Sequence, residues 1–239
     1  MADLAKFKHN EVAHILNHNT RSTVVNSNPD VDQTRSHLNY EISIHDDNLT
    51  PLDRYLKRKS EVYCYNRGDV NTMASWIISA PKELETDEEI KTFFENCVDF
   101  LSDRYGKENA ILATVHLDEG VKIKKMDRWG NQIKDKDGNT IEEVVGRPHL
   151  HFNFIPVIKT SKRPEGKISF KEAIPYKEYF KFHPDLMKFL KKRGDKGADY
   201  IVSGVTKRNG RNYSVNELKD QTKNQNTFTF ENTKDIKKW

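Results

Sequence analysis

The fold of this chain is constrained most by two apolar segments, residues 111–117 and 150–157, which a highly charged stretch separates. They are the most apolar strand candidates in the sequence. The stretch between them, residues 120–147, contains two turn signals, Trp129-Gly130-Asn131 and Asp137-Gly138-Asn139. Gly and Asn are typical of turns because they tolerate left-handed backbone conformations. We therefore predict an exposed β-hairpin over 120–147, which returns the chain to where it left and lets the two segments pair as antiparallel strands.

Further strands and helices are predicted around this pair. Strands are expected at 2–8, 38–44 and 74–79. Helices are expected at 9–21, from Thr50-Pro51 through Leu56, at 87–105, at 183–192 and at 214–223. The helix over 183–192 is expected to begin at His183-Pro184-Asp185. No internal repeat is evident, and the predicted class is α+β, a central antiparallel sheet flanked by helices in one domain.

Composition excludes several classes of protein. The chain has 239 residues, 35% hydrophobic and 32% charged, with a mean hydropathy of −0.85. No stretch approaches the roughly 20 apolar residues of a spanning helix, so we expect no membrane insertion. Aromatic residues make up 10% of the chain and lie in patterned segments, which argues against disorder. Cys64 and Cys97 lack metal-type spacing, and the N-terminus has no apolar signal segment, so a cytoplasmic protein is expected.

Charge is distributed unevenly along the chain. Residues 158–239 carry 20 Lys+Arg and 10 Asp+Glu, a net charge of +10, whereas the preceding residues carry a net charge of −6. A basic segment of this kind favours a polyanion such as nucleic acid as partner, because each neutralised phosphate releases counterions. The alternative is a Lys-rich surface that only keeps the protein soluble.

Three histidines stand near the facing ends of the two apolar segments. His149 and His151 are two residues apart, so their imidazoles share one face of a strand. Pairing of the strands would bring His116 to the same face. Three nitrogen ligands with open positions suit a catalytic divalent metal better than a closed structural site. Asp118 and Glu119 follow at the strand end, where they could orient a ligand or act as a base. The alternative is that the histidines are ordinary half-buried polar residues.

A second polar group lies nearer the N-terminus. His18-Asn-Thr-Arg21 and Arg35-Ser-His-Leu-Asn-Tyr40 place histidine beside guanidinium and amide groups, which bind phosphate well. A neutral imidazole can attack phosphorus if a partner sets its tautomer. His9 and His14 lie in the same stretch, and the chemistry alone does not separate His9 from His18.

These strings resemble the MobV-type plasmid mobilisation relaxases, also called Mob/Pre proteins, a branch of the HUH endonucleases. The resemblance rests on His18-Asn-Thr-Arg21, Arg35-Ser-His-Leu-Asn-Tyr-Glu41, His116-Leu-Asp-Glu119 and Pro148-His-Leu-His-Phe152, with a weaker echo at Tyr213-Ser-Val-Asn-Glu-Leu-Lys219. It covers roughly residues 2–223. It implies a HUH relaxase fold and a metal-dependent enzyme that nicks one strand at the transfer origin of a plasmid or integrative element, which starts conjugative mobilisation.

The resemblance also implies residue roles. Its motif spacing selects His18 as the nucleophile that becomes joined to the 5′ phosphate, with Glu119 assisting. Mn²⁺ or Mg²⁺ would be held by His116, His149 and His151. Arg21 is expected to stabilise charge on the scissile phosphate. The alternative nucleophiles are tyrosines, as in other relaxases: Tyr40, Tyr55, Tyr63 and Tyr65.

The expected partner is origin DNA, single-stranded or locally melted at the nick. The residues expected to contact it are Asn19, Arg21, Arg35, His37, Asn39 and Tyr40. Bases could stack on Tyr40, His37 or Trp129. For Tyr40, a packing role in the core is the favoured alternative.

One departure from the family concerns the 120–147 stretch, which separates two motifs that are normally a few residues apart. It is either a passive excursion or a basic finger, carrying Lys122, Lys124, Lys125 and Arg128, that touches DNA beside the nick.

The expected organisation is a relaxase domain over 1–223 and a basic tail over 224–239. Because family members continue into a coiled or dimerising C-terminal region, we expect these residues to be part of a longer protein that dimerises through that region.

Two other functions remain open. One is a HUH-type replication initiator or transposase, and the other is a non-catalytic nucleic-acid-binding module whose histidines are structural.

Overall fold

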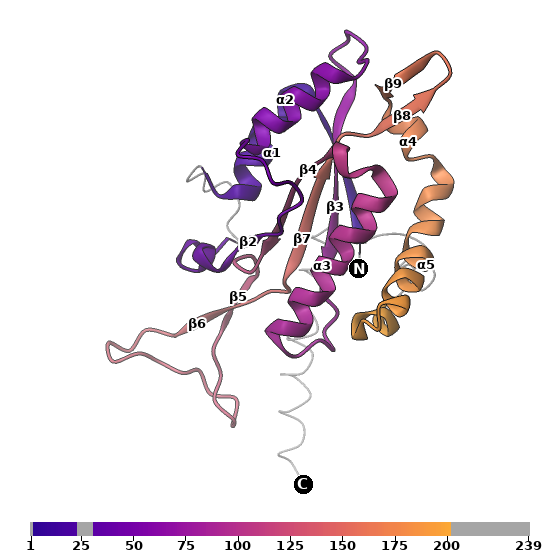
Figure 1. Ribbon diagram of the computed structural model, residues 1–239. Helices are drawn as coiled ribbons and strands as arrows, with labels where there is room; N and C mark the ends of the chain where they lie inside the picture. Colours follow the sequence, from indigo (N-terminus) through magenta and orange to yellow (C-terminus); the bar gives the residue numbers. More distant parts are fainter. Residues whose placement is uncertain (1, 23–30, 202–239) are drawn as a thin grey trace. The chain divides into compact units, whose positions relative to one another are not determined.

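An antiparallel sheet of five strands forms the centre of the protein (Figure 1). The computed structural model describes residues 2–22 and 31–201. The strands lie in the order β1-β3-β7-β4-β2, and every neighbouring pair is antiparallel. Their bounds are β1 Ala2–Lys8, β2 Tyr40–Glu41, β3 Asn71–Ser79, β4 Ala110–His116 and β7 His149–Phe154. This arrangement confirms the predicted α+β class with a central antiparallel sheet.

The pairing of β4 with β7 confirms the strand pair predicted from the apolar segments. His116 is the register partner of His149, and Thr114 is the partner of His151. Every residue of β4 is buried, and β3 covers the other edge of β7. The two strands that carry the histidines are therefore in the interior of the sheet, where neighbours on both sides fix their register.

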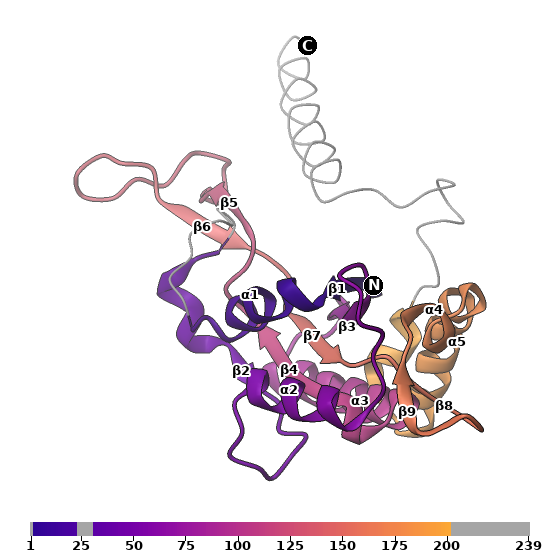
Figure 2. The same cartoon turned by 90° about the horizontal axis from the view of Figure 1, so that it is seen from above.

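Two hydrophobic cores lie on opposite faces of the sheet. The larger core includes Trp76, Phe152 and Phe182, and the smaller one includes Val12 and Tyr55. Helices α3 (Asp87–Tyr105) and α5 (Tyr176–Lys192) contribute to the larger core, and α1 (His9–Thr20) and α2 (Pro51–Glu61) to the smaller one. In Figure 2 the strands pass between α1 and α3. His149 and His151 alternate with the buried residues of the larger core, so they face the α1 side.

The helix starts follow local chemistry that the sequence makes visible. Thr50 accepts a hydrogen bond from Asp53 N and precedes Pro51 at the first helical position of α2. Thr86 and Glu89 form a capping box at the start of α3. Gly106 ends α3 with a φ of 89°, where a side chain would be strained. The predicted helices in these places are confirmed.

The strand predicted over 38–44 is wrong in extent. Residues Gln33–Leu38 form a 3-10 helix, η1, and the strand β2 covers only Tyr40–Glu41, with one further backbone bond from Ile42 N to Ala113 O of β4. The Asn39 side chain explains the later start of the strand, because its Oδ1 accepts a 2.8 Å hydrogen bond from Leu117 N. The side chain takes a place that backbone pairing would otherwise fill, so the strand cannot begin before Tyr40.

The predicted start of α5 is also wrong. The helix begins at Tyr176, and Pro184 lies inside it rather than at its beginning. An internal proline costs about 3 kcal/mol because it lacks the N–H and crowds the preceding turn. Phe182, Leu186 and Leu190 are fully buried, and burial of three such side chains outweighs that cost.

Several short elements follow β7 that the sequence did not indicate. The strand predicted over 150–157 ends at Phe154. Beyond it lie the hairpin strands β8 (Val157–Thr160) and β9 (Arg163–Ile168) and the short helix α4 (Phe170–Ala173). Two further 3-10 helices are η2 (Lys107–Asn109) and η3 (Lys196–Tyr200). The predicted helix over 214–223 and the boundary at 223 lie outside the described residues.

The 120–147 insert forms the predicted hairpin. Its strands are β5 (Val121–Lys124) and β6 (Glu142–Val145), and it projects from the sheet where β4 and β7 carry their histidines (Figure 1). Both turn signals are real turns, with Gly130 at φ 83° and Gly138 at φ 85°. The expectation that the chain contains no internal repeat is wrong here. The pattern Asp-x-x-Gly-Asn occurs in both turns with the same backbone arrangement. None of the helices in the described part of the chain has the length and apolar content of a membrane span.

We predict that the insert is dispensable for folding, because its described side chains belong to neither hydrophobic core. Replacement of residues 122–144 by Asn-Gly keeps Val121 paired with Val145 across a two-residue turn. The melting temperature should then stay within about 3 °C of the wild type, since about 1 kcal/mol shifts a domain of this size by roughly 2–4 °C. Differential scanning calorimetry measures the change. A loss of cooperative unfolding would show that the insert is needed for β4 to pair with β7.

Candidate metal centre

Four side chains with metal-ligating atoms converge at one end of β4 and β7. His116 ends β4, Glu119 follows it, and His149 and His151 lie on β7. One ligand atom from each lies within 4.8 Å of the others. The predicted convergence of the three histidines is therefore present, and Glu119, which the sequence suggested as a base or as a residue that orients a ligand, lies within the same group.

The hydrogen bonds of two histidines orient their rings. His149 Nδ1 lies 3.1 Å from Arg147 O, which leaves Nε2 toward the cluster, 3.6 Å from Glu119 Oε2. His116 Nε2 lies 2.8 Å from Asn19 O, which leaves Nδ1 toward the cluster, 3.2 Å from Glu119 Oε1. A ring nitrogen that donates to a carbonyl fixes the tautomer, so the other nitrogen presents a lone pair.

His151 gives an independent indication that the cluster suits a metal. Its Nε2 is buried and has no hydrogen-bond partner among the described residues. A buried polar atom without a partner costs about 1–3 kcal/mol, so such atoms are rare unless a ligand or water completes them. Three imidazoles and one carboxylate are a donor set that Mn²⁺, Mg²⁺ and related divalent ions accept.

The electrostatics of the cluster favour deprotonated ligands. Burial lowers the pKa of His149 and lowers that of His151 well below its usual value, so both rings are neutral near pH 7. Burial opposes ionisation of Glu119, but its hydrogen bonds with His116 and His18 hold the pKa of its carboxyl well below the usual range. Neutral imidazoles and an ionised carboxylate are the forms that bind metal ions.

Arg21 connects the end of α1 to the acidic pair that follows β4. It caps α1 in the left-handed region, with φ 55° and ψ 23°. Its Nε and Nη2 donate to Asp118 Oδ2 and Oδ1 at 2.9 and 2.8 Å, and Nη2 also donates to Glu119 Oε1 at 2.6 Å. Its Nη1 donates to His18 O at 2.7 Å. The side chain therefore fixes His18 and Glu119 with respect to each other.

Asp118 is the buried partner in this network; the sequence suggested it as a base or a residue that orients a ligand, not as the partner of Arg21. Its side chain is fully buried and also accepts a 2.6 Å hydrogen bond from Ser36 Oγ in η1. Burial opposes ionisation, but Arg21 and Ser36 lower the pKa of Asp118 to about 2. The adjacent acidic residues in the sequence were a signal for a cation partner, but the sequence did not show which one.

His18 is the histidine of α1 that reaches the cluster. It lies in the last turn, its Nε2 is 3.6 Å from Glu119 Oε1, and 28% of its side chain is exposed. His9 lies at the opposite end of α1 with Nδ1 3.0 Å from Tyr55 Oη, and His14 is exposed. The structure therefore separates His18 from His9, which the chemistry of the sequence could not do.

The other residues expected to contact DNA lie around the same end of the sheet. Asn19 is buried and holds His116 through its carbonyl. Arg35 and His37 are in η1, and His37 is exposed, with Nδ1 2.9 Å from Thr34 O. Tyr40 is half-buried against the larger core, and burial raises its pKa to about 12. This environment fits the packing alternative for Tyr40, and the DNA contacts stay predictions.

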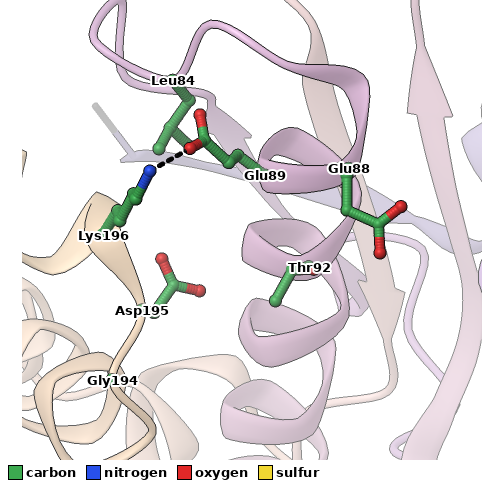
Figure 3. Close-up of a pocket in the computed structure, with 7 residues that line it drawn as sticks. All are labelled: Leu84, Glu88, Glu89, Thr92, Gly194, Asp195 and Lys196. Atoms are coloured by element: carbon green, nitrogen blue, oxygen red, sulfur yellow. Dashed lines mark hydrogen bonds and ion pairs between the residues drawn. The ribbon is translucent and has the colours of Figure 1, made fainter.

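A cavity of about 160 Å³ lies elsewhere, between α3 and the start of η3 (Figure 3). It is lined by Glu88, Glu89 and Thr92 on one side and by Asp195 and Lys196 on the other, and Lys196 forms an ion pair with Glu89. None of the metal-cluster groups lines it, so it is separate from the candidate metal centre.

The insert touches the metal centre at its root. Gly146 lies so close to Glu119 that an added Cβ would be 1.8 Å from Glu119 O and 2.7 Å from Gly120 Cα. On the other side, Val31 forms a β-bridge with Glu119, and Asp32 N donates to Asp118 O at 2.8 Å. Backbone on both sides thus positions Glu119.

The chain matches the Mob_Pre family, described as plasmid recombination enzyme, over residues 1–213. A plasmid recombination enzyme of Lactiplantibacillus plantarum is 28% identical over 224 residues, covering 92% of this chain and 52% of the relative. One from a Bacillus species is 26% identical and covers 92% and 49%. The chain thus spans about half the length of these curated relatives.

Solved structures resemble this fold. A relaxase domain of MobM, Mn-bound and in complex with plasmid pMV158 oriT DNA, matches with a TM-score of 0.66 at 24% identity, covering 92% of this chain and 97% of that one. Another MobM relaxase domain, bound to a 26-nucleotide oriT DNA, matches with a TM-score of 0.58 at 20% identity, covering 91% and 98%. At these identities the likeness shows a common fold.

We predict that Gly146→Ala weakens Mn²⁺ binding although Gly146 carries no ligand. The new methyl group must displace the backbone of Glu119, and outer contacts of this kind alter metal affinity by about 10–100-fold. Isothermal titration calorimetry with Mn²⁺ measures the affinity. Gly68→Ala is the matched control, since Gly68 is exposed with nothing near its Cβ position. Equal affinities of the two variants, both folded by circular dichroism, would contradict the prediction.

Proposed function

The chain belongs to the Mob_Pre family of plasmid recombination enzymes, and we propose that it is a metal-dependent relaxase that nicks one strand of transfer-origin DNA. The observation that carries this proposal is His18 standing beside the cluster of His116, Glu119, His149 and His151. A nucleophile next to a set of metal ligands is the arrangement that cleavage of a phosphodiester requires. The nick would start conjugative mobilisation of a plasmid or integrative element.

Mn²⁺ or Mg²⁺ is the proposed cofactor, held by His116, His149 and His151 with Glu119 beside them. When bound, the ion supplies positive charge to the non-bridging oxygens of the scissile phosphate. The Mn-bound MobM relaxase domains support this choice of metal. The neutral forms of His149 and His151 support it as well, because protonated rings could not ligate.

His18 is the proposed nucleophile. A neutral ring nitrogen attacks phosphorus, a phosphorus–nitrogen bond forms, and the bond to the 3′ oxygen breaks. That oxygen takes a proton from water and leaves as a hydroxyl, and the hydroxide left behind takes the N–H proton of the phosphorylated ring. The 5′ phosphate stays on His18, so the strand can later be rejoined by the reverse reaction. Glu119, 3.6 Å from His18 Nε2, orients the imidazole.

Arg21 is proposed to act on both the nucleophile and the phosphate. Its bonds to Asp118 and Glu119 hold the acid that orients His18. Its Nη1 also lies 3.4 Å from His18 Nε2, so the guanidinium stands beside the imidazole. The guanidinium charge at this position would stabilise the transition state of phosphoryl transfer.

The proposed partner is origin DNA, single-stranded or locally melted at the nick, as the MobM complexes with oriT DNA suggest. The proposed contacts are Asn19, Arg21, Arg35, His37, Asn39 and Tyr40. A cytoplasmic location follows from this substrate, and a dimer through a further C-terminal region remains an expectation. A replication initiator or transposase would instead nick a replication origin or transposon end, so the choice of origin DNA distinguishes these functions.

The metal requirement generates a prediction about His151. Wild-type protein with Mn²⁺ should relax supercoiled plasmid that carries the origin of its own element, and His151→Ala should not, because the cluster loses a buried ligand atom. DNA affinity, measured by fluorescence anisotropy, should change little, because phosphate contacts carry it. His14→Ala is the control with an exposed histidine outside the cluster. Nicking by His151→Ala at the wild-type rate would overturn the metal assignment.

The nucleophile generates a second prediction. His18→Ala should bind origin DNA and Mn²⁺ but form no covalent adduct, whereas His9→Ala and His14→Ala should form it. A phosphorus–nitrogen bond to imidazole is labile in acid and stable in alkali, which distinguishes it from a phosphotyrosine. Mass spectrometry of the digested adduct identifies the residue. A nucleotide on Tyr40, Tyr55, Tyr63 or Tyr65 would overturn the mechanism and leave the metal site in place.

A further inference from the structure

The proposed function gives no role to the two turns of the insert, which share one sequence pattern. Residues 126–133 read Met-Asp-Arg-Trp-Gly-Asn-Gln-Ile, and residues 134–141 read Lys-Asp-Lys-Asp-Gly-Asn-Thr-Ile. We call them the first lobe and the second lobe. Each has Asp at its second position and Gly-Asn at its fifth and sixth, and the bridges Met126–Gln132 and Lys134–Thr140 close them.

The same hydrogen bonds hold both lobes. In the first, Asp127 Oδ1 accepts from Trp129 N and Asn131 N, both at 2.8 Å, and Oδ2 accepts from Asn131 Nδ2 at 3.1 Å. In the second, Asp135 makes the equivalent bonds to Asp137 N and to Asn139, at 2.8 to 3.2 Å. The two aspartates therefore serve the turns internally, since their carboxylate oxygens already accept backbone and amide protons.

A ring of backbone hydrogen bonds joins the lobes to the β5–β6 stem. Lys125 N donates to Ile141 O, Ile141 N donates to Ile133 O, and Ile133 N donates to Lys125 O, at 2.8 to 2.9 Å. Three chain segments thus meet at one closed junction. The lobes are consequently held as a defined structure rather than as a long loop, although their side chains belong to neither core.

The lobes differ in the side chains that they expose. The first lobe carries Arg128 and Trp129, and 70% of Trp129 is exposed to solvent. The Arg128 guanidinium lies over the indole at 3.9 Å from the ring centroid. The second lobe carries Lys136 and Asp137 at the same two positions. The turn therefore needs neither the arginine nor the tryptophan, and a largely exposed indole calls for an explanation outside the turn itself.

The position and charge of the insert indicate which kind of partner the Trp129 indole contacts. The stem leaves the sheet directly after Glu119 and returns just before His149, so it begins and ends at the metal centre. The described basic side chains of the insert are exposed: Lys124, Lys125, Arg128, Lys134, Lys136 and Arg147. The insert projects from the end of β4 and β7 that carries the metal cluster (Figure 1). DNA whose scissile phosphate lies at His18 would therefore have these cations within reach of its flanking phosphates.

We propose that the first lobe binds the single-stranded DNA that flanks the nick, with one unpaired base stacked on Trp129 and a phosphate beside Arg128. The inference rests on the proposed relaxase function. One face of the indole is covered by Arg128 and the other stacks on the base, so the guanidinium also polarises the ring from behind. An unpaired base is required, because both faces of a base inside a duplex are covered by the neighbouring base pairs. The second lobe supports the first without taking a base.

The test compares Trp129→Ala, Trp129→Tyr and Asp137→Ala, all in a His18→Ala background that prevents cleavage. Fluorescence anisotropy gives the affinity for two single-stranded origin oligonucleotides, one long on both sides of the nick and one that ends a few nucleotides from it. Trp129→Ala should weaken binding of the long oligonucleotide by about tenfold, the order expected of one base stack. Trp129→Tyr should restore most of the affinity, and Asp137→Ala should leave it unchanged.

Two further measurements separate this inference from the proposed function. In one measurement, 2-aminopurine replaces the bases of the long oligonucleotide one position at a time. At one position the fluorescence should fall when protein that carries Trp129 binds, and should not fall when the Trp129→Ala variant binds. With His18 restored, nicking of the short oligonucleotide should be unaffected by Trp129→Ala.

If wild-type protein nicks that oligonucleotide but Trp129→Ala binds the long one normally, the inference is wrong and the relaxase function stands. An equal loss with double-stranded flanks would overturn the stacking of an unpaired base. Failure of the wild type to nick any origin DNA would remove the proposed function itself.

Discussion

The contact between Arg21 and Asp118 is the interaction on which the metal centre depends. The Asp118 side chain is fully buried, and removal of one partner from a buried ion pair costs about 3–5 kcal/mol because a charge is left unpaired. The left-handed backbone at Arg21 costs roughly 1–2 kcal/mol for a residue with a side chain, and the ion pair offsets it. The contact joins the end of α1 to the end of β4. Ser36 of η1 also donates a hydrogen bond to the Asp118 carboxylate, which holds η1 at the same place. His18 and Glu119 are neighbours for this reason.

The parts of the fold that the sequence predicted are those set by local patterns. Thr50-Pro51 indicates the start of one helix, and apolar spacing with Gly106 behind it indicates another. The two Gly-Asn turns indicate that the chain returns, so the pairing of β4 with β7 follows. The errors arose where distant contacts decide. The Asn39 side chain accepts a hydrogen bond from Leu117 N across the fold, so the strand starts later than predicted. Pro184 looked like a helix start, but buried residues on both sides of it hold the helix together.

The same distinction separates the predicted and the missed parts of the candidate site. Alternation along one strand was enough to place His149 and His151 on a common face. His9 and His18 could not be separated by chemistry, but nine residues of helix place them roughly 13 Å apart along the axis, so only one reaches β4. Glu119 within the metal cluster, and Asp118 as the partner of Arg21, depend on three elements that meet only in the folded chain.

The insert shows which property of the family motif matters for the site. Its two halves are far apart in this sequence, yet His116 and His149 are direct register partners, so the strands bring them together whatever the connection contains. The entropic cost of closing a loop grows slowly with its length, and the lobes lower it further because hydrogen bonds already order them. The connection must preserve one feature at its base. There Gly146 packs directly against the backbone of Glu119, with no side chain between them. An insertion is therefore compatible with the metal centre when it preserves strand register and this close approach, and the chain beyond the root is free to acquire a separate binding surface.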